Sequence, residues 1–145
     1  MDLSKIRRKL EEAKSLEEKR LIVEELRDRR SRLWELYRMW ILSVVGVLSG
    51  QMFSGLCVAY SYVIHNNALV TVFIAVLQGL VIPLAVCSRG LLRTSRQIKE
   101  IDNILLDPPM LPLEEKDIII LLIIGIAITI IGTIFGLAAL GIIHL

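Results

Sequence analysis

The sequence predicts an all-α integral membrane protein with three transmembrane helices. Two uncharged stretches carry this prediction, because residues 39–88 and residues 118–145 contain no Asp, Glu, Lys or Arg. About 20 apolar residues are enough for a helix to cross the hydrocarbon core, so the first stretch has room for two spans and the second for one. The composition agrees, since 54% of the 145 residues are hydrophobic.

Residues 1–33 form a charged segment that we expect to be a cytoplasmic helical stalk. Apolar residues recur there at helical spacing, with Arg30 at one position of the stripe, and Ser15 followed by Glu18 is a capping-box pattern. A short helix that folds back on a longer one is therefore predicted. No Gly or Pro occurs before Gly46, so the longer helix should continue unbroken into the first span. Its charged face is either a solvated surface or a coiled-coil face for a partner or for copies of the chain.

The first span is predicted over residues 34–64, with its ends marked by aromatic side chains. These rings are Trp34, Tyr37, Trp40, Tyr60 and Tyr62. Trp and Tyr favour the two membrane–water boundaries, and at helical rise Trp40 and Tyr60 are about 30 Å apart. This distance equals the thickness of a hydrocarbon core.

A second span, residues 68–88, follows the polar turn at residues 65–67. Pro83 lies near its inner end and cannot donate a hydrogen bond to the carbonyl of Gly79. We therefore expect a kink at this point of the second span.

Residues 89–117 are predicted to form an amphipathic cytoplasmic helix and a Pro-rich linker. One face of the helix carries Arg89, Arg93 and Arg96. These residues either bind lipid headgroups or only follow the charge rule for cytoplasmic segments. The helix should lie along the membrane surface or pack against the stalk. Paired prolines end it, and Pro112 and the acidic residues after it suit the start of the third span, residues 118–145.

The basic residues predict the orientation of the chain. All seventeen Lys and Arg residues lie either between Lys5 and Arg38 or between Arg89 and Lys116. Basic segments next to spans stay on the cytoplasmic side, so we expect a cytoplasmic N-terminus and an external C-terminus, in the cell membrane.

Small and polar residues form a line along each of two spans. The line on the first span, called here the first-span seam, consists of Ser43, Gly46, Gly50, Gln51, Ser54 and Ser61; the line on the third span consists of Gly125, Thr129, Gly132 and Gly136. Small residues allow helices to pack closely in lipid, and this accounts for both lines. Alternatively, the first-span seam faces a central pathway in an oligomer. Gln51 is expected either to hydrogen-bond to Gln78 or to line that pathway.

The sequence predicts no enzymatic activity, no cofactor and no metal site. Catalytic motifs are missing, and the spans lack the ionisable residues on which ion-coupled transport depends. Cys57 and Cys87 should differ in depth by about 18 Å, which is too far for a disulfide, and the two Cys and two His do not have zinc-ligand spacing. A net charge of +2 gives no reason to expect nucleic-acid binding.

Two functions fit these features. The first is a homo-oligomeric membrane protein in the lipid bilayer that acts as a passive ion or small-solute channel along the first-span seam. The alternative is a non-conducting membrane scaffold or assembly factor that recruits a cytoplasmic protein partner through residues 1–33.

Overall fold

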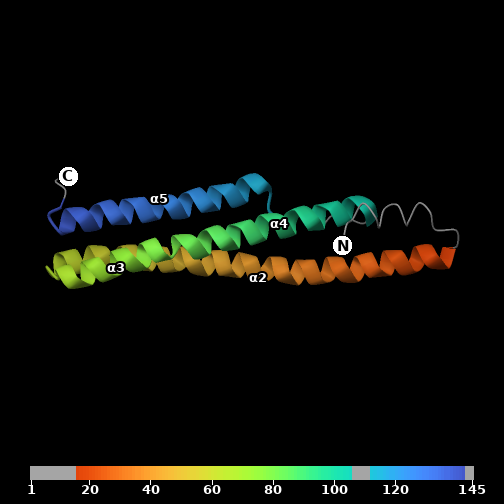
Figure 1. The fold of residues 1–145 in the computed structure, drawn as a ribbon, viewed down its shortest axis with the longest axis horizontal. Helices are drawn as coiled ribbons and strands as arrows, with labels where there is room; N and C mark the ends of the chain where they lie inside the picture. Colours follow the sequence, from red (N-terminus) through yellow and green to blue (C-terminus); the bar gives the residue numbers. More distant parts are fainter. Residues whose placement is uncertain (1–15, 106–111, 143–145) are drawn as a thin grey trace.

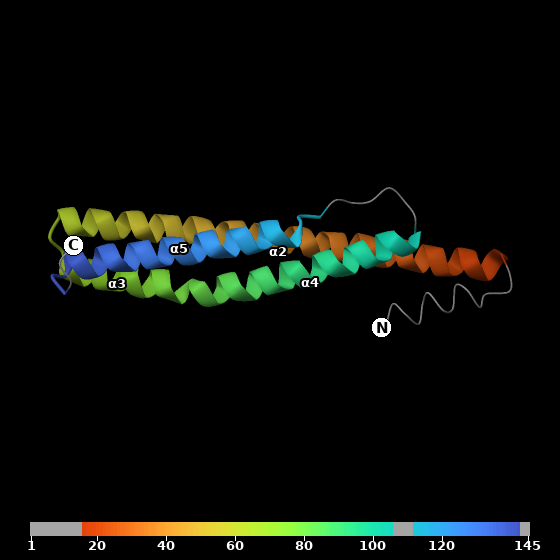
Figure 2. The same cartoon turned by 90° about the horizontal axis from the view of Figure 1, so that it is seen from above.

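The computed structural model describes residues 16–105 and 112–142, and these residues form a bundle of long helices without a β-strand. In chain order the helices are α2 (Leu16–Val63), α3 (Asn67–Gly79), α4 (Val81–Leu105) and α5 (Glu115–Ala139). The helix α2 runs in one direction, α3 and α4 together return beside it, and α5 lies over the line between them (Figures 1 and 2). Three helical segments are long and apolar enough to cross a membrane, which confirms the prediction of an all-helical chain with three helices of that kind.

The helix α2 is continuous over 48 residues, so the charged segment from residue 16 and the first span form one helix, as predicted. At 1.5 Å per residue its length is about 70 Å, more than twice the thickness of a hydrocarbon core. The predicted short helix before it and the capping box at Ser15 lie outside the described residues. So do residues 106–111, which hold most of the predicted Pro-rich linker.

The elements α3 and α4 together form one returning helix, called here the return helix. It is interrupted at Leu80, three residues before Pro83. Pro83 has no N–H for the carbonyl of Gly79, and the helical pattern resumes with a hydrogen bond from the Leu84 N–H to the Leu80 carbonyl (3.2 Å). The interruption lies at the point of the second span where the sequence predicts a kink. At the opposite end, the side chain of Asn66 accepts a hydrogen bond from the Leu69 N–H and caps α3.

No helix break separates residues 88 and 89, so the end of the predicted second span and the predicted amphipathic segment belong to one helix. The amphipathic residues form the second half of α4 and continue in line with the span, beside α2 (Figure 1). Only Gly90 could weaken the helix here, and the ring of Trp40 packs against it. Of the two predicted arrangements, packing against the charged part of α2 is the one observed.

The core of the bundle repeats every seven residues. In α2 the buried positions at this spacing are Tyr37, Val44, Gln51 and Val58, and in the return helix they are Leu77, Leu84, Leu91 and Ile98. Such spacing keeps one stripe of each helix facing its neighbours over many turns, as in left-handed bundles. The seven-residue spacing continues from Leu77 to Leu84 across the interruption at Leu80. The interruption therefore does not change which side of the helix faces the core.

Candidate functional site

The first-span seam is divided between two sides of α2. Gln51, Ser54 and Ser61 are buried in the bundle, Gly50 is half-buried, and Ser43 and Gly46 are exposed. The seven-residue repeat passes through Val44 rather than Ser43. Ser43 and Gly46 therefore face away from the other helices. The Ser43 hydroxyl donates to the Met39 carbonyl of its own helix (2.9 Å).

A hydrogen bond joins α2 to α5 in the middle of the predicted first span. Gln51 is fully buried, and its Nε2 donates to the Thr129 hydroxyl (3.1 Å), which in turn donates to the Gly125 carbonyl (3.0 Å). The Oε1 of Gln51 has no hydrogen-bond partner among the described residues. The predicted bond between Gln51 and Gln78 is wrong, because the core repeat places Leu77 inside and turns Gln78 outward.

The glycine line of α5 lies against large side chains of the other helices. A Cβ at Gly125 would overlap the Leu84 side chain, and one at Gly132 would lie 2.9 Å from Leu77 Cδ2. A Cβ at Gly136 would overlap the side chain of Ile74. Glycine at these positions thus lets α5 approach α3 and α4 closely, with Thr129 between them as the one polar member of the line.

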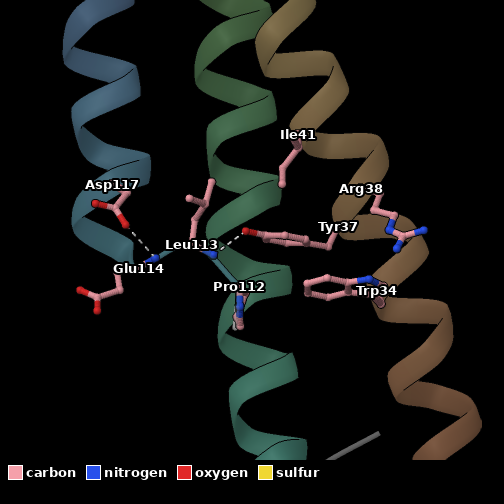
Figure 3. A pocket seen from close by; sticks show the side chains of 8 residues that line it. All are labelled: Trp34, Tyr37, Arg38, Ile41, Pro112, Leu113, Glu114 and Asp117. Carbon is pink, nitrogen blue, oxygen red and sulfur yellow. Dashed lines mark hydrogen bonds between the residues drawn. The ribbon is translucent and has the colours of Figure 1, made fainter. Parts of the chain in front are cut away.

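A polar cluster lies where the uncharged runs of α2 and α5 begin. The buried Tyr37 hydroxyl accepts a hydrogen bond from the Leu113 N–H (2.6 Å), and this bond ties α2 to the segment that leads into α5. The ring of Trp34 stacks on Tyr37 with centroids 5.2 Å apart, and the Arg38 guanidinium lies 6.0 Å from the centroid of Trp34 (Figure 3). These residues line a cavity of about 470 Å³ together with Ile41, Pro112, Glu114 and Asp117. Figure 3 shows the side chains that line it.

Ion pairs connect the charged ends of the helices. Arg30 and Asp102 meet at 2.6 Å between α2 and α4, with side chains only 10% and 8% exposed. Arg96 donates two hydrogen bonds to Glu115 (2.8 and 2.9 Å) and so joins α4 to the start of α5. The bonded guanidinium lowers the pKa of Glu115 below its ordinary value.

The three arginines predicted to bind lipid headgroups have different surroundings. All three are exposed on α4, and Arg96 is in addition paired with Glu115. The described residues contain no cluster of three or more His, Cys, Asp or Glu side chains that could hold a metal ion, and Cys57 and Cys87 are free thiols.

Sequence reasoning missed the contacts that depend on how the helices are aligned. The position of Arg30 in an apolar stripe was a visible sign that this cation is buried, but its partner Asp102 is 72 positions away in the chain. No local pattern indicates that Thr129 meets Gln51 or that Leu113 meets Tyr37. No protein-family model, curated protein or solved structure matches the chain.

Proposed function

We propose that the chain is a non-conducting membrane scaffold that holds a rigid helical arm in the cytoplasm and recruits a protein partner there. The arm is defined as residues 16–33 of α2 together with residues 89–105 of α4. The observation that carries the proposal is the continuity of α2, because a single helix transmits the position of the span directly to the arm. At helical rise, residues 16–33 add about 26 Å to the span.

The two helices of the arm are held together by a well-packed contact. Leu26, Ile98 and Ile101 are at most 1% exposed, and the ion pair between Arg30 and Asp102 lies in the same layer of the bundle. Removing one partner of such a pair leaves a buried charge and is strongly destabilising, so the pair fixes the alignment of the two helices. A fixed arm offers a partner a surface that does not need to be ordered on binding, which favours recruitment.

The polar groups of the first span support packing rather than conduction. Gln51 is engaged with Thr129 inside one copy of the chain, and Ser54 and Ser61 are also buried there. Large apolar side chains such as Phe53 and Leu56 cover the outer surface of the span and suit contact with lipid. The channel remains the competing proposal. The observation in its favour is that the Oε1 of Gln51 has no hydrogen-bond partner within residues 16–105 and 112–142.

A flux measurement separates the two proposals. The purified chain is reconstituted in liposomes, and the movement of K⁺, Ca²⁺ and Cl⁻ is compared with that in empty liposomes. A scaffold predicts no flux above the empty control, both for the natural sequence and for Gln51→Leu. Selective flux that Gln51→Leu alters would establish the channel and overturn the scaffold.

Site-specific photo-crosslinking tests recruitment directly. A photoreactive amino acid is placed at Leu21 in the arm or, as the matched control, at Phe53 in the span; the two side chains are 67% and 66% exposed. We expect a protein adduct of defined size from position 21 in the native membrane and none of that size from position 53. The same adducts from both positions, or none from position 21, would contradict recruitment through the arm.

A further inference from the structure

Arg89 lies deeper in the bundle than the charged residues that precede the other two spans. Trp40 packs against Gly90, which places Arg89 level with the third residue of the uncharged run of α2. Leu84 lies against Gly125, and five residues along the antiparallel helices α4 and α5 (Figure 1) lead from this contact to the third residue of the uncharged run of α5. At helical rise this level is about 4 Å inside both runs, so Arg89 lies at the edge of the hydrocarbon core.

Arg93 follows Arg89 one turn later on the same face of α4, and both side chains are exposed. Residues four apart on a helix have Cβ atoms about 5–6 Å apart, so the two guanidinium groups can reach one group of atoms between them. The rise over four residues is about 6 Å, which is close to the thickness of the headgroup layer on one side of a bilayer. Arg89 and Arg93, called here the boundary arginines, therefore both lie at the depth of lipid headgroups.

The carboxylates at the start of α5 have other partners. Glu115 accepts two hydrogen bonds from Arg96, and Glu114 forms an ion pair with Lys116 (2.8 Å). These two cations lower the pKa of the carboxyls that they contact. Asp117 accepts the Glu114 N–H (3.2 Å). In the part of the chain that the structure describes, neither boundary arginine forms an ion pair, so an anion for them has to come from outside this part of the chain.

We propose that the boundary arginines bind the phosphate of an anionic phospholipid. A cation at the edge of the hydrocarbon core needs a counter-ion, and the lipid phosphate is the anion that every bilayer provides at this depth. The planar guanidinium group can donate two hydrogen bonds to a phosphate at once. A zwitterionic headgroup also brings an ammonium group, which the two guanidinium groups repel, so an anionic headgroup is preferred. The site does not depend on the recruitment of a protein partner by the arm.

Native mass spectrometry of the full chain, released from detergent in the presence of defined lipids, tests this site. The probes are phosphatidylglycerol, which is anionic, and phosphatidylcholine, which is zwitterionic, with identical acyl chains. One basic residue near an anionic membrane surface contributes about fivefold in affinity. We therefore expect phosphatidylglycerol to be retained at least about tenfold more tightly than phosphatidylcholine. Equal retention of the two lipids would overturn the proposal.

Glutamine variants and a matched control assign the contact to the boundary arginines. Arg89→Gln and Arg93→Gln should each weaken retention of phosphatidylglycerol about fivefold, and the double variant about 25-fold. The control is Arg20→Gln, because Arg20 is also exposed but lies 18 residues before Arg38, about 27 Å along α2 at helical rise. It should retain the lipid as the natural chain does. If Arg20→Gln weakens retention as much as the boundary variants, general surface charge is responsible and the site is refuted.

A charge-conserving variant separates loss of the lipid contact from a disturbed helix. The chain with both Arg89→Lys and Arg93→Lys keeps the two positive charges, so most of the preference for phosphatidylglycerol should remain. A loss as large as in the double glutamine variant would show that the charges are not responsible.

A soluble competitor distinguishes a lipid from a free phosphoester. Glycerophosphoglycerol has the headgroup of phosphatidylglycerol without acyl chains, so it should not displace the lipid at equal concentration. Displacement at equal concentration would show that the boundary arginines take a soluble ligand and would contradict the lipid site.

Discussion

Replacing Thr129 by Val should destabilise the bundle more than replacing its partner Gln51 by Leu. Val has nearly the shape of Thr, so the substitution removes the hydroxyl with little change in packing. It leaves the fully buried amide of Gln51 without the acceptor of its Nε2 hydrogen bond, while Oε1 already has no partner among the described residues. Gln51→Leu instead removes the whole amide, and the Thr129 hydroxyl keeps the Gly125 carbonyl as its acceptor.

The magnitudes follow from this asymmetry. Side-chain hydrogen bonds between membrane helices contribute about 0.6 kcal/mol on average and up to about 1.7 kcal/mol. A buried polar group left without a partner costs about 1–3 kcal/mol. We expect Thr129→Val to lower the free energy of unfolding by about 1–2 kcal/mol, Gln51→Leu to change it by less than about 1 kcal/mol in either direction, and the double variant to match Gln51→Leu.

The free energy of unfolding can be measured by titrating SDS into mixed micelles and following tryptophan fluorescence. Trp40 packs against Gly90 of α4, so its emission reports the contact between α2 and α4. The double-mutant cycle then gives the coupling between Gln51 and Thr129. Equal costs for the two single variants with no coupling would refute the reasoning, as would a cost below about 0.5 kcal/mol for Thr129→Val, which is the result expected if water reaches Gln51.

Two further predictions concern the packing and the charged end of α5. Gly125→Ala should lower the free energy of unfolding by about 1–3 kcal/mol, because the new methyl group would overlap the Leu84 side chain, whereas Gly46→Ala has no atom within 4 Å and should be neutral or stabilising. The same SDS titration measures both, and equal costs would contradict the close approach. The ion pair with Arg96 lowers the folded-state pKa of Glu115 below 4.5, so its stabilisation is present above that pH and is lost as the pH falls through the folded value. The difference in stability between the natural chain and Glu115→Gln should therefore disappear in acid; a difference that persists would contradict the assignment.

The helices and their interruptions could be predicted because their causes are local in sequence. The absence of Gly and Pro before Gly46 predicts the continuous α2, and the missing N–H of Pro83 predicts the interruption at Leu80. The glycine line of α5 is visible for the same reason, since its spacing alone places it on one face. These features need no knowledge of which helices are neighbours.

The contacts between helices could not be predicted because they depend on how far each helix is shifted along its neighbour and on which of its sides faces the bundle. Short sequence patterns determine neither. Steps of three and four residues fit a stripe that starts at Ser43 almost as well as one that starts at Val44, yet only the second faces the bundle. An error of one position likewise exchanges Leu77 for Gln78 in the core. The pair between Arg30 and Asp102 requires, in addition, that α4 continue past the span rather than turn along the membrane.

The single hydrogen bond of Gln51 gives the alignment of α2 and α5 a physical cause. Sliding α5 by one seven-residue repeat would place Leu122 or Gly136 opposite Gln51, and neither side chain offers an acceptor. Apolar packing alone distinguishes such alignments weakly, because most large side chains in this part of α5 are Ile or Leu. A buried amide that finds a hydrogen-bond partner in one alignment only is a known means of fixing the register of helices. The same alignment brings Leu113 to Tyr37 and so forms the cavity where the two spans begin.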